Sequence, residues 1–80
     1  MEYFLITEDA DILTGFGLAG IRGVQVDSHA HCMQEIEKAA ARKEIAILLI
    51  THSLANLCRP QIDYLKHHAR HPLVVEIPVK

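Results

Sequence analysis

The sequence has no tryptophan and few other aromatic residues. Only 5% of its 80 residues are aromatic, whereas half are apolar. The core must therefore be built from isoleucine, leucine, valine and alanine, a composition typical of an ordered α/β domain rather than a disordered chain. The length predicts one domain, residues 1–80. A domain this small has little surplus stability, so we expect it to depend on a binding partner.

Long apolar runs, excess positive charge and paired cysteine motifs are also missing. The longest apolar run, Ile45 to Ile50, is six residues, far short of the ~20 that cross a bilayer. The formal net charge of -2 offers no basic face for nucleic acid. Cys32 and Cys58 do not form a C-x-x-C motif, which predicts reduced thiols and no structural disulfide. These absences favour a cytoplasmic protein that inserts into no membrane and binds no nucleic acid.

The stretch from Phe4 to Ile21 predicts a buried strand, an acidic turn and an amphipathic helix. The apolar run Tyr3 to Ile6 is too short for a helix and is typical of a strand covered on both faces. Carboxylates follow where the positive end of a helix dipole favours them; they are Glu8, Asp9 and Asp11. The helix would pack on the sheet through a stripe made of Ile12, Leu13, Phe16 and Ala19. We expect Phe16 to be buried in this interface.

Three further strands are predicted, at Val24–Val26, Glu44–Thr51 and Leu73–Ile77. The first is short enough to be an edge, the second holds an unbroken apolar run with β-branched isoleucines, which predicts a central position, and prolines flank the third. Helical patterns separate these strands. This alternation implies a parallel sheet with right-handed crossovers and helices on both faces.

The helices between these strands carry their own start signals. Asp27 or Ser28 would cap the second helix, whose inward stripe would be Met33, Ile36, and Ala39 or Ala40. Ser53 would cap the third helix. Pro60 interrupts that helix, because its ring clashes with the preceding turn, so the helix either kinks or restarts there.

Gly15, Gly17 and Gly20 spell the G-x-G-x-x-G pattern of dinucleotide-binding folds. That chemistry needs the first glycine at the strand-to-helix turn and an acidic residue about 20 positions later. Here the glycines fall two turns into the helix, and Asp27 follows too soon. We therefore expect glycines that allow close packing, and no bound cofactor.

Polar residues collect where the first and third strands end. The segments Thr7 to Asp11 and Thr51 to Ser53 would line the crevice at the carboxyl ends of these strands. The acidic residues resemble those of phosphoryl-accepting receiver domains, which hold magnesium, but no carboxylate follows the third strand. We therefore predict a helix-capping turn without a tight magnesium site.

Six histidines raise the question of metal binding or catalysis. The candidate ligand groups are His29, His31 and Cys32, and His67, His68 and His71. A zinc site needs three or four converging ligands, and Pro72 ends the helix before His71 can share a face with His67. A nucleophilic pair of Cys58 and His52 would lack an orienting group. We predict no metal site and no catalytic residues.

A family signature accounts for these features better. After the acidic turn, Gly15, Phe16, Leu18, Ala19 and Gly20 match the Gly-Phe-x-Leu-Ala-Gly helix of the F subunit of V-type and A-type rotary ATPases, which the sequence resembles. Glu44 to Thr51 is similar to the third strand of that family, and Pro72 to Pro78 to its fourth strand, which ends in Glu76, Ile77 and Pro78. Family members often carry a basic residue in place of Gly17 and usually continue into a helical tail, whereas this sequence ends at Lys80.

The resemblance implies an α/β fold with Rossmann-like or flavodoxin-like topology, in which four parallel strands have the order 2-1-3-4. It implies a non-catalytic central-stalk (rotor) subunit that binds a helical stalk protein, the D subunit of these complexes, and needs no cofactor. Such a subunit helps couple ATP hydrolysis or synthesis to proton or sodium transport, and reaches the membrane only through its complex. The alternative is a stand-alone receiver-like or ligand-binding module that uses Glu8, Asp9 and Asp11.

Overall fold

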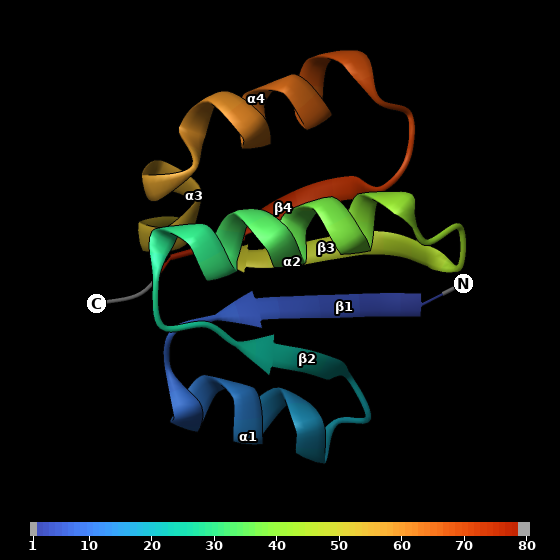
Figure 1. Ribbon diagram of the computed structural model, residues 1–80. Coiled ribbons are helices and arrows are strands. Elements are labelled where there is room, and N and C mark those ends of the chain that lie inside the picture. The colour runs from blue at the N-terminus through green and yellow to red at the C-terminus, as the bar shows by residue number, and fades with distance from the viewer. Residues whose placement is uncertain (1, 79–80) are drawn as a thin grey trace.

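The structure is a computed structural model that describes residues 2–78. Strands and helices alternate along this part of the chain (Figure 1). The strands are β1 (Glu2–Thr7), β2 (Arg22–Gln25), β3 (Ile45–Thr51) and β4 (Leu73–Ile77). The helices are α1 (Ala10–Leu18), α2 (His29–Ala41), α3 (His52–Leu57) and α4 (Arg59–His68).

The four strands form one parallel sheet in the order β2-β1-β3-β4. This confirms the predicted fold class and strand order. The unbroken apolar strand β3 lies inside the sheet, and the shorter β2 and β4 form its edges. In the middle of the sheet Leu5 of β1 is level with Leu49 of β3, which is level with Val75 of β4.

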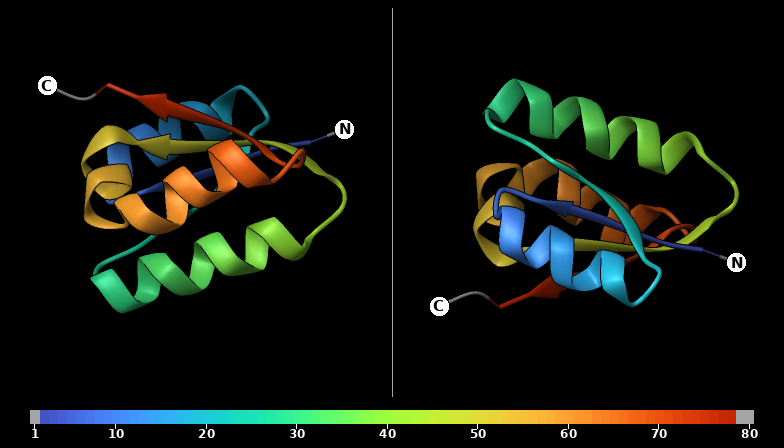
Figure 2. Two further views of the ribbon diagram at one scale, coloured as in Figure 1. Left: turned by 90° about the horizontal axis from the view of Figure 1, so that it is seen from above. Right: turned by 90° about the horizontal axis from the view of Figure 1, so that it is seen from below.

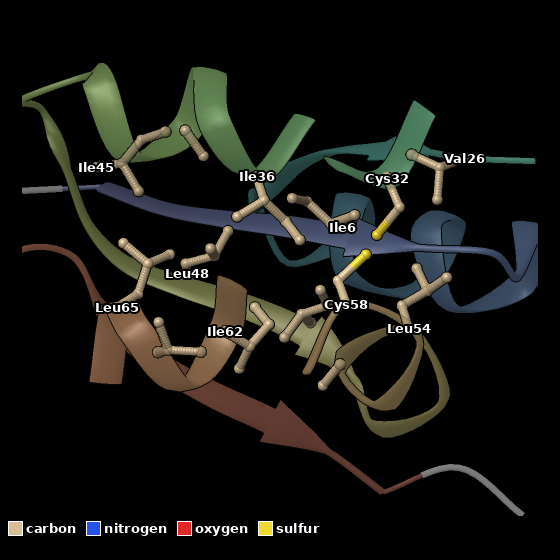
Figure 3. Packing of buried hydrophobic residues seen from close by; sticks show 14 residues of the cluster. Ile6, Val26, Cys32, Ile36, Ile45, Leu48, Leu54, Cys58, Ile62 and Leu65 are labelled. Carbon is tan, nitrogen blue, oxygen red and sulfur yellow. The ribbon is translucent and has the colours of Figure 1, made fainter. Parts of the chain in front are cut away.

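Helices cover both faces of the sheet, but unequally. Figure 2 shows α2 and α4 on one side and α1 alone on the other. The main core lies under α2, α3 and α4 and is aliphatic, as the composition predicts; Ile6, Ile36, Leu48 and Ile62 are fully buried in it. Cys32 and Cys58 are free, buried thiols in this core, with their sulfur atoms pointing toward each other in Figure 3.

The residues that start the helices were only partly predicted. Ser28 caps α2 by accepting a hydrogen bond from the backbone N–H of His31. Pro60 lies in the first turn of α4, where a missing N–H costs nothing, so the helical region restarts there. Ser53 is not the cap of α3, because α3 begins at His52, two residues earlier than a Ser53 cap implies, with Thr51 at the N-cap position.

Two predicted core positions are wrong. Phe16 is only half-buried, and α1 buries none of its residues, because this helix packs mainly on β1 and β2 and lies alone on its side of the sheet (Figure 2). Met33 is 41% exposed. Ile36 and Ala39 are buried as predicted, but Cys32 takes the place of Met33 in the inward stripe of α2 and lies against Cys58.

Candidate functional site

The crevice at the carboxyl ends of β1 and β3 is the topological switch point of the sheet, where ligands bind in many α/β folds. The side chain of Glu8 lies in it. Thr51 Oγ1 donates a hydrogen bond to Glu8 Oε1 at 2.6 Å, and the Ser53 hydroxyl donates to Glu8 Oε2. Burial opposes the charged form of Glu8, yet the bonds from Ser53 and Thr51 outweigh it and hold the pKa of Glu8 below its usual value.

The two aspartates of the acidic turn hold the start of α1. Asp9 is the N-cap, and its Oδ1 accepts hydrogen bonds from the backbone N–H groups of Asp11 at 2.8 Å and Ile12 at 3.2 Å. Thr7 Oγ1 in turn accepts from the Asp9 N–H at 3.0 Å. Asp11 stands in the first turn, where the helix dipole favours a negative charge. These contacts agree with the predicted capping role.

The crevice therefore brings together the two predicted segments through the hydrogen bonds of Thr51 and Ser53 to Glu8. The Glu8 carboxylate occupies the place where an anionic ligand would meet the Thr51 and Ser53 hydroxyls. The end of β3 contributes hydroxyls and no carboxylate, unlike the receiver-like alternative. Within residues 2–78, no group of three His, Cys, Asp or Glu side chains is placed to hold a metal ion.

A second polar cluster lies at the end of β4, around Glu76. Arg59 donates to both carboxylate oxygens, at 2.6 and 3.0 Å. Lys66 Nζ and His52 Nδ1 lie 2.5 and 2.8 Å from the same carboxylate. The Arg59 bonds, followed by those of Lys66, hold the pKa of Glu76 well below its usual range. This cluster links α3 and α4 to β4 through ion pairs with Glu76. Its members are not related by any regular spacing in the sequence, so sequence reasoning did not find it.

Cys58 and His52, which were considered and rejected as a nucleophilic pair from the sequence, do not contact each other as such a pair. His52 contacts Glu76 and Asn56, whereas Cys58 is buried in the core. Burial, followed by contact with Cys58, raises the pKa of Cys32 to about 12. A thiol in this state is protonated and unreactive at neutral pH.

The glycine pattern ends a helix and does not form a phosphate loop. Gly20 has a φ of +87°. Its N–H bonds the carbonyl of Gly17, and the N–H of Ile21 bonds that of Phe16, which is the Schellman arrangement at a helix C-terminus. Gly15 lies inside α1, far from the turn after β1.

The signature residues lie in two separate places. Gly15 and Leu18 of α1, and Ala19 and Gly20 just after it, are exposed, and Leu18 is 86% exposed. Ile77 ends β4 level with Thr51, and Pro78 follows it. Part of the signature therefore lies on the surface at α1. Packing within residues 2–78 does not explain why these residue types occur there.

Comparisons with known proteins identify a matching family and a solved structure with a similar fold. A family model described as ATP synthase (F/14-kDa) subunit matches residues 4–80. The fold is similar to the crystal structure of the F subunit of the V-type ATP synthase from Archaeoglobus fulgidus, with a TM-score of 0.79 and 18% sequence identity over 95% of each chain. Comparison with curated proteins gives no significant match. The family match confirms the resemblance inferred from the signature residues, and the structural similarity supports the strand order.

Proposed function

Since this chain belongs to the family of ATP synthase (F/14-kDa) subunits, we propose that it is a non-catalytic central-stalk subunit of a V-type or A-type rotary ATPase. In this role it binds a helical-hairpin stalk protein resembling the D subunit of these ATPases. It helps couple ATP hydrolysis or synthesis to proton or sodium transport.

The match of the family model to residues 4–80 carries this proposal. The switch-point crevice supports it, because the Glu8 carboxylate occupies the place of an anionic ligand and repels phosphate. The start of α1 supports it too, because its turn carries Asp9 and Asp11 in place of a glycine loop that could cradle a nucleotide. A scaffold role needs neither site.

We place the protein on the cytoplasmic side, peripheral to the membrane through the rest of the ATPase. In residues 2–78 no helix is long and apolar enough to cross a membrane. The free thiols Cys32 and Cys58 are compatible with a reducing compartment.

Co-expression with the D subunit encoded in the same genome tests the proposal. The two proteins should co-elute in size-exclusion chromatography, and the isolated protein should show no ATPase activity. Binding should raise the melting temperature in proportion to the logarithm of the partner concentration above its dissociation constant. A well-folded protein that fails to co-elute, or that hydrolyses ATP alone, would contradict the proposal.

A further inference from the structure

The two cysteines of the chain meet in the core although they belong to separate elements. Cys32 lies in α2, whereas Cys58 is the joint between two helices, the C-cap of α3 and the N-cap of α4. Their sulfur atoms point toward each other (Figure 3), and the two thiols share a hydrogen bond. The fold therefore holds two free cysteines side by side as a dithiol.

The contact between the sulfur atoms is what gives this pair a chemistry of its own. A single buried cysteine packs like a small apolar residue, so burial alone assigns no role to either thiol. In the part of the chain that the structure describes, no further His, Cys, Asp or Glu side chain joins the pair in a group that could hold a metal ion. The reaction open to two adjacent thiols is closure to a disulfide by thiol–disulfide exchange.

A surface hollow at the carboxyl end of the sheet leads toward the pair. Its lining includes Val26 and Leu54, which are also members of the core cluster that contains both cysteines. Figure 3 shows these two side chains beside the thiols. Val26 and Leu54 therefore separate the dithiol from the solvent in this hollow.

The Leu54 side of this wall belongs to a weakly held helix. α3 has six residues, and its N-cap makes no side-chain hydrogen bond. Its side-chain bonds to the end of the sheet, from His52 to Glu76 and from Ser53 to Glu8, are exposed. Local unfolding of such a segment requires less free energy than unfolding of the whole domain. It would move Leu54 away and expose Cys58 at the end of the same helix.

We propose that Cys32 and Cys58 form a redox modification site, which a small-molecule disulfide such as glutathione disulfide closes to an intramolecular disulfide. Cys58, exposed by local unfolding of α3, releases its proton to water, and its thiolate attacks one sulfur of glutathione disulfide. One glutathione thiolate leaves and takes up a proton. Cys32 then loses its proton to water, attacks the Cys58 sulfur of the mixed disulfide and displaces the second glutathione. Two protein thiols lose two electrons, and one external disulfide is reduced to two thiols.

Closure would link α2 covalently to the joint between α3 and α4. Arg59, which follows Cys58, donates to Glu76 of β4, so the link also restrains the residue that holds β4. A disulfide between positions 32 and 58 restricts the unfolded chain and so favours the folded state. We expect the dithiol in a reducing compartment and the disulfide when the ratio of disulfide to thiol rises.

The test equilibrates the unmodified full chain in mixtures of reduced and oxidised glutathione, both in native buffer and in urea, and measures masses after quenching with acid. The folded chain should become a monomer that has lost two hydrogen atoms. Its equilibrium constant for closure should be about 100-fold or more larger in native buffer than in urea, because folding holds the thiols together. The oxidised protein should melt about 10 °C or more above the reduced one, and dithiothreitol should reverse the change.

Two matched controls, Cys32→Ala and Cys58→Ala, keep one thiol each. Each should bind at most one glutathione, and oxidation should not raise its melting temperature. These variants identify the effect of the link itself, while the main measurement uses the unmodified chain and does not depend on how well they fold.

Three results would overturn the proposal. The first is a closure constant that is equal in native buffer and in urea, or a disulfide that lowers the melting temperature. The second is oxidation that yields only mixed disulfides or linked dimers. The third is closure that occurs in urea but never in native buffer, since the folded protein would then not be modified. The experiment contains no partner protein, so its failure would leave the proposed function intact, and failure to bind the D subunit would leave the disulfide intact.

Discussion

The four glycines allow a sharp prediction, because the same substitution should change stability in opposite directions. Gly15 and Gly17 lie inside α1 with open space where a Cβ would be. Gly20 has a φ of +87°. Gly23 has room for no side chain, because an added Cβ would lie 2.6 Å from the Leu5 carbonyl oxygen and 2.8 Å from Leu5 Cβ. Replacing each in turn with alanine separates helix propensity, backbone strain and packing.

Gly15→Ala and Gly17→Ala should each stabilise the fold by about 0.5 to 1 kcal/mol, since alanine restricts the unfolded chain and favours the helix. For 80 residues this is a rise in melting temperature of about 3 to 6 °C. Gly20→Ala should cost about 1 to 2 kcal/mol, because an L-residue is strained at positive φ. Gly23→Ala should cost about 1 to 3 kcal/mol. Its clash is with backbone that cannot rotate away, so we expect the upper end.

Thermal and urea unfolding of the four variants measure these differences, with far-UV circular dichroism as the probe. The order of stability should be Gly15→Ala and Gly17→Ala above the original protein, then Gly20→Ala, then Gly23→Ala. A destabilised Gly15→Ala variant would refute the reasoning, because it would mean that Gly15 already packs closely within the free chain. A Gly23→Ala variant as stable as the original protein would show that the Leu5 carbonyl oxygen is further from Gly23 than the 2.6 Å contact of an added Cβ implies.

Four further predictions follow from the same contacts. Phe16→Ala should lower the free energy of unfolding in urea by about 1 to 2 kcal/mol, less than the ~3 to 5 kcal/mol typical of a core aromatic, because Phe16 is only half-buried. A loss of ~3 kcal/mol or more would show that Phe16 belongs to the core. Glu76→Gln should cost about 1 to 2 kcal/mol at neutral pH, a value discounted for partial exposure. Folding lowers the pKa of Glu76, so the charged Glu76 contributes fully to stability above the usual carboxyl pKa of about 4.3, and this contribution is lost as the pH falls below it. The difference in unfolding free energy between Glu76→Gln and the original protein should therefore shrink in acid. A difference that does not change with pH would contradict this reasoning. Cys32 and Cys58 should react with a thiol reagent only at the rate of unfolding, since both are buried; rapid labelling of the native protein would be the opposite result. Calorimetric titration with magnesium should show no saturable binding in the micromolar range, because Glu8 is bonded to hydroxyls; a tight site lost in Asp9→Asn would revive the receiver-like alternative.

Local pattern was enough to predict the strands. The apolar run before Thr51 and the proline-flanked segment Leu73–Ile77 became β3 and β4 with the expected positions in the sheet. Both signals depend on residues next to each other in the chain. Strand order is different, because pairing of β1 with both β2 and β3 is a long-range property. Only the family resemblance specified it.

Side-chain partners across the sheet were not predictable in the same way. Glu8 meets Ser53, and Arg59 meets Glu76, only after parallel pairing has aligned the ends of β1, β3 and β4. The segments were expected to share one edge, yet which oxygen accepts from which donor depends on register and on where α3 begins. The prediction of Ser53 as a cap failed for this reason. The start of α3 lies two residues earlier than predicted, and the Ser53 hydroxyl therefore donates to the Glu8 carboxylate instead of capping the helix.

The wrong burial of Phe16 has a different cause. An apolar stripe at helical spacing shows that a helix has one apolar face, but it does not show whether that face meets its own chain or another. In α2 the stripe meets the core through Ile36 and Ala39, as predicted, with Cys32 in place of Met33. In α1 the stripe of Ile12, Phe16 and Ala19 lines a surface hollow, and a Cβ on Gly15 beside it would meet nothing within 4 Å. A helix that must pack within its own chain gains from alanine at such a position, whereas a helix that receives a partner gains from glycine. Of the glycines that imitate a nucleotide motif, Gly20 is explained by its positive φ at the end of α1, whereas Gly15 and Gly17 have no close neighbour within residues 2–78 that would require glycine.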